Sequence, residues 1–192
     1  MVDDKQLVER ALAGSEDAYR EIVERYQRPI YSLVVRMVRD PSMAEDLAQD
    51  VFCKAFKALG TFDRTRKFSS WLFKIAHNSA IDQLRKRRIS TISLETDDAE
   101  SDDPLRRYAD PDAEDPEEYS RRQELGTAIE ASLGALRPEY REILVLRFEQ
   151  EKSYEEISEI TDLPLGTVKT HLHRARKALA KDLSQQGWFP GE

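Results

Sequence analysis

Residues 153–183 carry the pattern of two helices joined by a tight turn, and this pattern constrains the fold more than any other feature of the chain. Ser153 and Glu156 have the spacing of a capping box, in which the serine hydroxyl and the glutamate carboxylate each accept a backbone N–H of the other residue. Pro164 ends the first helix, because the residue before a proline is driven out of the α conformation. We therefore expect a short helix, a turn and a second helix that begins near Pro164.

The second of these helices has one apolar face and one basic face. Its apolar residues recur at helical spacing and are Val168, Leu172, Ala175, Leu179 and Leu183. Its other face carries Lys169, Thr170, His173, Arg174 and Lys177, with no acidic residue between Leu163 and Lys181. A short helix followed by a helix of this kind is the geometry that enters the major groove of DNA. The segment therefore predicts a DNA-binding helix-turn-helix.

The composition favours an all-α protein. Charged residues make up 35% of the chain and aromatic residues 8%, with 7 glycines and 8 prolines, which is typical of helices rather than of a sandwich or barrel. The 192 residues are enough for one domain or for two small ones.

The net charge of −7 is concentrated in one segment. Between Glu95 and Glu124, thirteen acidic residues stand against four arginines, a local balance of −9, so the remainder of the chain is at +2. Residues 96–118 also have hardly any apolar side chains, and such a stretch cannot bury enough surface to offset its ordering entropy. We expect a flexible acidic linker, whose charge does not exclude DNA binding by the rest.

The sequence predicts neither secretion nor membrane insertion. Residues 1–4 lack the basic start and the apolar core of a signal peptide, and the apolar stretch Ile30–Val38 is short and interrupted by Arg36. The single cysteine, Cys53, excludes an internal disulfide and fits a reducing compartment. We expect a cytoplasmic protein.

The first half of the chain predicts four helices. The expected helices cover residues 5–13, a long segment capped by Ser15 with a kink at Pro29, residues 42–59, and residues 68–88. The third begins with a second capping box, Ser42 to Glu45, and ends before Gly60.

The third helix carries a polar stripe opposite its apolar side. On a helical wheel of about one hundred degrees per residue, Asp46, Gln49, Asp50 and Cys53 fall together. Such a stripe is usually a solvated face, but a cysteine is more often buried than placed among polar residues. A docking surface for a partner would account for both observations.

The fourth helix and the loop before it suit unpaired nucleic acid. Trp71, Lys74, Asn78 and Arg85 share one side of the helix, and Phe62–Phe68 is a basic loop flanked by aromatic residues. An exposed ring stacks a base, cations hold phosphates and an amide reads a base edge. The alternative is that Trp71 belongs to the core and that the basic residues are merely solvated.

Both halves together resemble the extracytoplasmic-function, or group IV, sigma factors of bacterial RNA polymerase. The resemblance covers nearly the whole chain outside the acidic linker. In the first half it rests on residues 40–41, 44–52, 68–76, Asn78, Asp82 and 85–88; in the second half it rests on residues 153–157 and 164–169. Ser158 departs from the usual alanine, and His171 and His173 stand where arginine is frequent, so promoter preference does not carry over.

The resemblance implies two small helical domains and a role in transcription initiation. Residues 1–92 correspond to sigma region 2, which binds core polymerase and opens the minus-ten element; residues 93–118 form the linker; residues 119–187 correspond to the region 4 helix-turn-helix, which reads the minus-thirty-five element. The implied partners are the clamp and flap regions of core RNA polymerase, duplex and single-stranded promoter DNA, and an anti-sigma factor. The implied protein is a monomer when free, needs no cofactor and serves a stress or envelope response.

The same resemblance assigns three groups of residues. The docking stripe, which would bind polymerase, is Asp46, Gln49, Asp50 and Cys53. The minus-ten set is Phe62, Arg64, Arg66, Lys67, Phe68, Trp71, Lys74, Asn78 and Arg85, with the loop and Asn78 holding a base flipped out of the duplex. The minus-thirty-five set is Lys169, Thr170, His171, His173, Arg174 and Lys177.

Two other classes of protein fit the sequence less well. A helix-turn-helix regulator with a helical sensing domain would need neither Trp71 nor the basic loop, and it would usually dimerise, for which no heptads are present. An enzyme is disfavoured by three histidines, one cysteine and the lack of a glycine-rich phosphate loop. His171 and His173 point about two hundred degrees apart on a helix and would not share a metal, so we expect no metal site.

Overall fold

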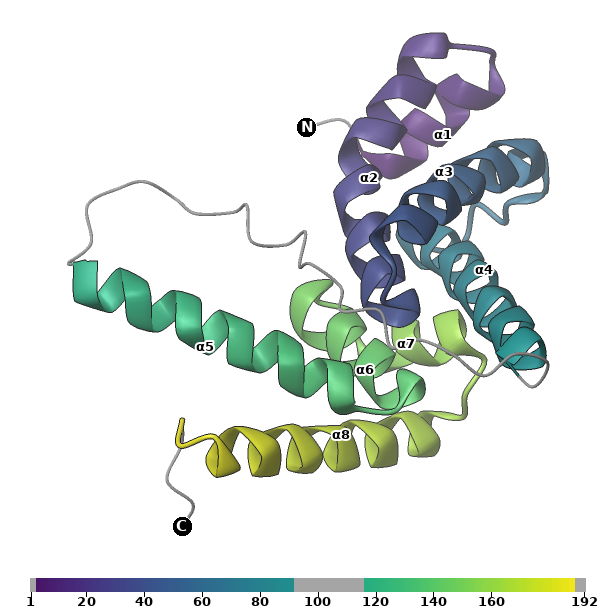
Figure 1. Ribbon diagram of the computed structural model, residues 1–192. Helices are drawn as coiled ribbons and strands as arrows, with labels where there is room; N and C mark the ends of the chain where they lie inside the picture. Colours follow the sequence, from purple (N-terminus) through teal and green to yellow (C-terminus); the bar gives the residue numbers. More distant parts are fainter. Residues whose placement is uncertain (1–2, 92–115, 189–192) are drawn as a thin grey trace.

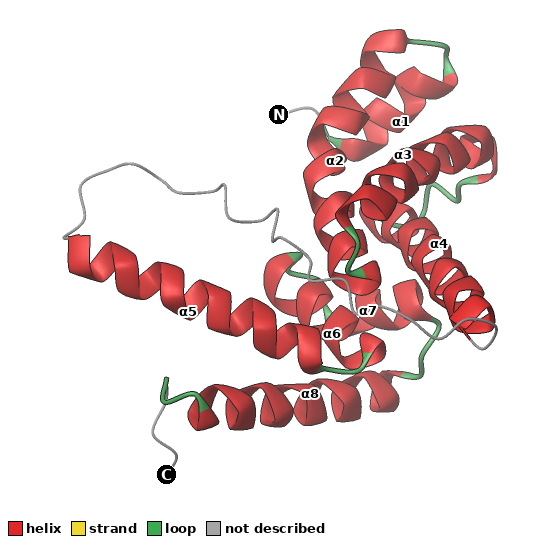
Figure 2. Ribbon diagram, viewed as in Figure 1, coloured by secondary structure: helices red, strands yellow, loops and turns green. Residues whose placement is uncertain are grey.

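The protein folds into helices that form two packed groups. The computed structural model describes residues 3–91 and 116–188, and over these ranges it contains helices, turns and loops but no strand (Figures 1 and 2). The helices of the first domain are α1 (Asp4–Leu12), α2 (Glu16–Val38), α3 (Pro41–Ala58) and α4 (Phe68–Thr91), with a 3-10 turn at Leu59–Thr61. Those of the second are α5 (Pro116–Ala135), α6 (Pro138–Leu144), a π-helical segment (Val145–Glu149), α7 (Tyr154–Thr161) and α8 (Leu165–Gln185).

Helix α2 is the centre of the first domain, since it packs against α1, α3 and α4. Its inward face buries Ile22, Ile30 and Leu33 completely. The Ser15 hydroxyl accepts the Ala18 N–H at 3.4 Å, which confirms the predicted cap. The helix ends at Arg39, which takes a left-handed conformation with φ of 55°. These contacts fix the directions of α3 and α4, which carry the candidate binding residues.

The N-cap of helix α3 lies two residues earlier than the sequence predicts. Its N-cap is Asp40, whose Oδ1 accepts the Met43 N–H at 3.0 Å, so the expected Ser42 capping box is wrong. The reason is Pro41, which needs no hydrogen-bond acceptor for its nitrogen and has a φ suited to the first helical position. The cap therefore falls on the residue before the proline. The helix ends at Ala58, and the 3-10 turn takes up Gly60.

The second domain contains the predicted helix-turn-helix as α7 and α8. The capping box is present, with the Ser153 N–H donating to Glu156 Oε2 at 2.8 Å and the Glu156 N–H donating to Ser153 Oγ at 3.1 Å. Helix α7 ends at Thr161, and Asp162 follows with a left-handed φ of 56°. The turn therefore starts at Asp162, one residue before Leu163, whose conformation Pro164 restricts. Of the predicted apolar face of α8, four residues are buried and Leu179 is half-buried; the buried residues are Val168, Leu172, Ala175 and Leu183.

The predicted linker lies almost wholly outside the described residues. Only its last three residues, 116–118, are described, and they form the first turn of α5. Helix α5 then runs alongside α8, and the two helices lie side by side at the bottom of Figure 1.

Arg141 ties the second domain together and joins it to the first. This buried guanidinium donates to the backbone oxygens of Leu133, Gly134 and Leu136 at 2.8 Å each, and to that of Arg36 in α2 at 2.7 Å. Burial, with the nearby charge of Arg39, lowers the pKa of Arg141 to about 10, so the side chain stays charged at neutral pH. Helices α6 and α7 thereby pack against α2 and α4, and the buried apolar residues of both domains form one continuous cluster.

Candidate nucleic-acid interface

The docking stripe lies on the outer side of α3. The opposite side of the helix buries Ala48, Val51, Phe52 and Ala55. Asp46, Gln49 and Cys53 are exposed, and the Asp50 carboxylate, about half exposed, pairs with Lys54 Nζ at 2.6 Å. The helix thus has the predicted division into a core face and a polar face that is free to meet another molecule.

The loop between α3 and α4 is shaped by Asp63. Its Oδ1 accepts the Thr65 N–H at 2.9 Å and the Thr65 hydroxyl at 2.7 Å, and its backbone oxygen accepts the Arg66 N–H at 3.0 Å. The hydrogen bonds from the Thr65 side chain and backbone lower the pKa of Asp63. This turn leaves the side chains of Arg64, Arg66 and Lys67 exposed to solvent.

The two phenylalanines of the minus-ten set belong to the core. Phe62 and Phe68 are 8% and 4% exposed, and their ring centroids are 5.6 Å apart. Trp71 lies 5.1 Å from Phe62 and 5.7 Å from Phe68, and Tyr26 of α2 completes the cluster. The sequence placed both phenylalanines among the DNA contacts, whereas this structure uses them to anchor the loop. They are hidden because the aromatic rings pack edge to face beneath the turn.

The rest of the minus-ten set lies along one side of the loop and α4. Asn78 and Arg85 are exposed, and Trp71 and Lys74 are half-buried. Phe73, on the opposite side of the helix, is fully buried. Trp71 is therefore partly core and partly surface, which combines the two interpretations that the sequence left open.

Helix α4 and Lys67, which precedes it, also meet residues that the sequence did not associate with them. Lys67 Nζ lies 3.2 Å from Glu156 Oε1, and Lys74 Nζ lies 2.5 Å from Asp162 Oδ1. Lys152 Nζ donates to Ser69 Oγ at 2.9 Å and sits 4.8 Å from the centre of the Phe73 ring. Burial lowers the pKa of Lys152. No local pattern could have revealed these pairs, because their members are more than eighty residues apart.

The minus-thirty-five set lies on the outer face of α8, with one exception. The exposed members are Lys169, Thr170, His173, Arg174 and Lys177. His171 is half-buried, its ring lies 5.2 Å from that of Tyr140 in an edge-to-face arrangement, and its Nδ1 is buried without a hydrogen-bond partner in the described part of the chain. This histidine packs against α6 and stands apart from the surface that the other five residues form.

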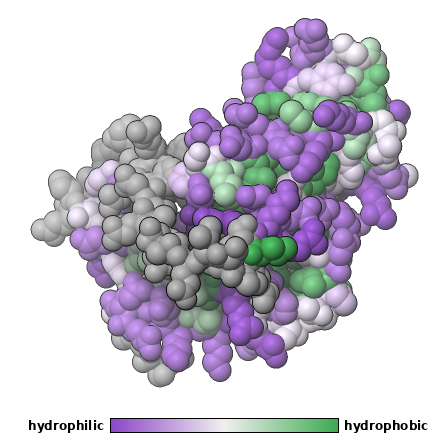
Figure 3. All heavy atoms as spheres, turned by 45° about the vertical axis from the view of Figure 1, so that its right-hand side comes forward, coloured by the Kyte–Doolittle hydropathy of each residue, from purple (hydrophilic) through white to green (hydrophobic). Residues whose placement is uncertain are grey.

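Other features of the described residues do not compete with these surfaces. No group of three or more metal-ligating side chains gathers within residues 3–91 and 116–188, and no helix there is long and apolar enough to cross a membrane. The exposed large apolar side chains, Leu12, Ile89, Tyr119 and Phe148, come from different elements, and the face in Figure 3 is mainly hydrophilic with scattered apolar patches.

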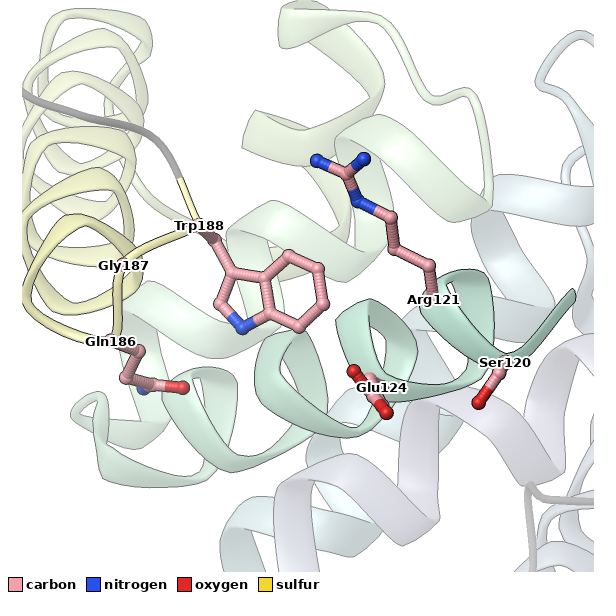
Figure 4. A pocket seen from close by; sticks show the side chains of 6 residues that line it. All are labelled: Ser120, Arg121, Glu124, Gln186, Gly187 and Trp188. Atoms are coloured by element: carbon pink, nitrogen blue, oxygen red, sulfur yellow. The ribbon is translucent and has the colours of Figure 1, made fainter. Parts of the chain in front are cut away.

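A shallow pocket lies between the start of α5 and the end of α8. It is lined by Ser120, Arg121, Glu124, Gln186, Gly187 and Trp188, with the indole of Trp188 on one side and the side chains of α5 on the other (Figure 4). Gln186 also donates to Ser132 Oγ of α5 at 3.1 Å. The pocket thus belongs to the seam between these two helices and contains no member of the three predicted groups.

Comparisons with known proteins agree with this arrangement. Residues 22–89 match the family described as Sigma-70 region 2, and residues 127–179 match Sigma-70, region 4. The first match covers the segment that the alternative interpretation treated as a sensing domain, so that alternative is set aside.

Relatives of similar length match over most of the chain. The ECF RNA polymerase sigma factor SigW of Bacillus subtilis is 38% identical over 93% of this chain and 96% of its own length. The ECF RNA polymerase sigma-E factor of Escherichia coli is 34% identical over 92% of both chains. The solved structure of CnrH in complex with the cytosolic domain of CnrY matches with a TM-score of 0.67 at 25% identity, covering 95% of this chain and 97% of that one. RpoE of Bartonella quintana, solved in complex with the anti-sigma factor NepR, shares the fold with a TM-score of 0.71 at 23% identity, over 86% of this chain and 96% of that one.

The fold and the comparisons agree. The chain has an all-α fold of two domains, with a polar stripe on α3, a basic loop before α4 and a helix-turn-helix in α7 and α8. It belongs to the extracytoplasmic-function sigma factors of the sigma-70 family.

Proposed function

We propose that the three groups of residues divide the work of transcription initiation among them. The docking stripe binds the clamp of core RNA polymerase, the accessible part of the minus-ten set opens the promoter, and the exposed part of the minus-thirty-five set reads duplex DNA. The observation that carries this proposal is that each group lies on a helix whose opposite side is buried in the core. Polar residues in such positions are free to bind a partner without loss of the fold.

Within the minus-ten set we assign different parts to different residues. Arg64, Arg66 and Lys67 on the exposed loop hold phosphates, and the outer edge of Trp71 stacks on a base. Asn78 reads the edge of a base pulled out of the duplex. Flipping a base costs a few kcal/mol, which stacking and hydrogen bonds at the base edge offset.

We also propose that an anti-sigma factor holds this chain inactive. CnrH, which resembles this chain over nearly its full length, was solved with the cytosolic domain of CnrY. The same proposal includes the domain limits, which are residues 1–92, 93–118 and 119–187. It also includes the role of the segment between the domains as a tether.

The polymerase-binding role is tested by charge reversal on α3. Asp46→Lys should weaken the binding of core polymerase at least tenfold while the thermal unfolding of the free chain shifts by only a few degrees, since exposed substitutions cost about half a kcal/mol or less. The control is Glu24→Lys, which makes the same change at an exposed position of α2. Equal binding by the two variants would remove the docking stripe from the polymerase interface.

The opening role is tested at Asn78. Holoenzyme that contains Asn78→Ala should keep its affinity for polymerase and for duplex promoter DNA but lose permanganate reactivity of the non-template strand at one position. The matched variant is Gln83→Ala, which removes an amide elsewhere on α4. Equal reactivity in the parent and in Asn78→Ala, at every base tried in that position, would show that Asn78 is only a surface amide.

A further inference from the structure

The first turn of α8 contains a glycine that the fold does not require. Gly166 is exposed, and a Cβ atom added to it would meet no described atom within 4 Å beyond its chain neighbours and the backbone of its own helix. Its φ is not in the left-handed region, so an alanine could adopt the same backbone. A glycine loses more conformational freedom in a helix than an alanine does, so this position lowers stability with no gain in packing. The space over Gly166 is therefore free for close approach by another molecule.

Thr170 lies one turn after Gly166 on the same side of the helix, and its hydroxyl bonds to the glycine. Thr170 Oγ1 donates to the Gly166 backbone oxygen at 2.8 Å, and the threonine is exposed. A threonine hydroxyl has one hydrogen to donate and two lone pairs that accept. The bond to Gly166 uses the hydrogen, so the oxygen that Thr170 presents to solvent can only accept.

The cations around Thr170 have the opposite capacity. Lys169, Arg174 and Lys177 are exposed on the same face, and lysine and arginine side chains only donate hydrogen bonds. Helix α8 lies at the lower edge of the molecule in Figure 1, where α5 and α6 pack on one side of it. The outer face of α8 thus combines several donors with an acceptor at Thr170.

The bases of DNA differ in what they offer to such an acceptor. In the major groove, adenine and cytosine each present an exocyclic amino group, which donates, whereas guanine O6 and N7 and thymine O4 only accept. An oxygen that can only accept therefore suits the amino group of adenine or cytosine. To bind guanine or thymine through its hydroxyl, Thr170 would first have to give up its hydrogen bond to Gly166.

We propose that Gly166 and Thr170 form a subsite of α8 that reads the amino group of an adenine or a cytosine. Gly166 lets the edge of the base pair approach the helix, and Thr170 Oγ1 accepts the amino hydrogen. The subsite lies in the N-terminal part of α8, the part that contacts base edges when a helix-turn-helix enters the major groove. This inference rests on the proposed role of α8 in reading duplex DNA, and it adds the type of base that Thr170 recognises.

The type of base is tested by removing its amino group. Holoenzyme made with this chain selects an upstream duplex from a random pool, and each adenine or cytosine of that duplex is replaced in turn by purine or 2-pyrimidinone, which lack the amino group. At one position we expect the parent to bind about two- to tenfold more weakly, the effect of one hydrogen bond. Thr170→Val, which has no acceptor, should bind the unmodified duplex more weakly by a similar factor and lose nothing further with that analogue. Thr170→Ser, which keeps the hydroxyl, should respond as the parent does.

The matched control for the hydroxyl is Thr127→Val on α5. Thr127 is also exposed, and its Oγ1 donates to the Gln123 backbone oxygen, four residues earlier, at 3.0 Å. This variant should bind every duplex as the parent does. The subsite is refuted if the parent and Thr170→Val respond equally to the analogue at every position.

Gly166→Ala tests the space over the glycine, and its two effects should have opposite signs. The thermal unfolding midpoint of the free chain should rise by about 1–4 °C, because the unfolded chain loses conformational freedom. Binding of the selected duplex should weaken at least fivefold, because the new methyl group stands where the base pair approaches. Gly126→Ala, at an exposed position of α5 where a Cβ also meets nothing within 4 Å, should raise the midpoint alike and leave DNA binding unchanged. Parental DNA binding by Gly166→Ala would contradict the proposal.

Arg174→Ala, measured on the same duplexes, distinguishes this inference from the role on which it rests. Unchanged binding by Arg174→Ala would mean that α8 does not read DNA, and the subsite would fall with that role. Weaker binding by Arg174→Ala, together with amino-free analogues that bind the parent as well as the natural bases do, would leave α8 as the reader and refute the subsite alone.

Discussion

The chain has two basic helical surfaces, one along α4 and one along α8, and they differ in whether their cations pair with another domain. Lys67 and Lys74 on the first are paired with carboxylates from another domain, whereas Lys169 and Arg174 on the second face solvent. Local sequence is similar in both places, with cations on one side of a helix and apolar residues on the other. The charge pattern of a helix thus indicates what the surface can bind, and the tertiary neighbours decide which of its cations already have a partner.

The aromatic residues differ between the two surfaces as well. The α4 surface is built over a cluster of Phe62, Phe68 and Trp71, so that side chains next to the DNA contacts also stabilise the domain. On α8 the exposed members of the set are polar, and the aromatic contact of His171 with Tyr140 lies apart from them, against α6. Substitutions of the aromatic residues at the α4 surface should therefore disturb fold and function together, and those of exposed polar residues on α8 should disturb function alone.

The largest expected effect is on stability, at the base of the α4 surface. Phe68→Ala should destabilise the first domain by about 3–5 kcal/mol, because it removes a buried ring and leaves a cavity. Urea unfolding followed by circular dichroism measures the change, and Arg64→Ala, on the exposed part of the same loop, should stay within about 0.5 kcal/mol of the parent. A stable Phe68→Ala chain that fails only in DNA opening would restore the ring to the DNA contacts.

The next effect is on binding at the α8 surface. Arg174→Ala should cost about 1–3 kcal/mol in binding a duplex that contains the upstream element, and it should relax the preference at one base pair. Fluorescence anisotropy against a set of single-base variants of that duplex measures both quantities. Its stability should match that of the parent, since Arg174 is exposed. Unchanged binding to every duplex would mean that α8 is not the helix that reads DNA.

A smaller effect separates the true helix cap from the apparent one. Ser153→Ala should destabilise the second domain by about 1 kcal/mol, because Glu156 loses the acceptor of its backbone N–H. Ser42→Ala should change the free energy of unfolding by less than about 0.5 kcal/mol, since Asp40 caps α3. Equal costs for the two substitutions would contradict the assignment of both caps.

The smallest effect concerns salt. Lys177→Ala should weaken binding to all duplexes alike and lower the slope of log affinity against log salt by about 1, because one phosphate contact is lost. A change confined to one DNA sequence would indicate instead that Lys177 contacts a base.

Much of the fold could be read from local patterns. Helical spacing predicts α1 to α4 and the pair α7 and α8, and the spacing of Ser153 and Glu156 predicts the capping box that the structure contains. The docking stripe of α3 follows from the same periodicity. These features depend on residues within a few turns of one another, and hydrogen bonds and side-chain directions over that distance are fixed by the helix itself.

Other outcomes depended on packing over longer distances. Helical periodicity does not decide whether three of the side chains are buried or exposed, namely Phe62, Phe68 and His171. Each of them turns inward because it packs against an aromatic ring of another element. The N-cap of α3 falls on Asp40 because Pro41 suits the first helical position, although Ser42 matches the sequence pattern of a capping box. The sequence by itself determined α1 to α4, α7 and α8, and which residues share a face of each helix. Only the tertiary structure decided that Glu156 pairs with Lys67 and Asp162 with Lys74, because an ion pair between residues 89 and 88 positions apart exists only once apolar burial has brought α7 against α4.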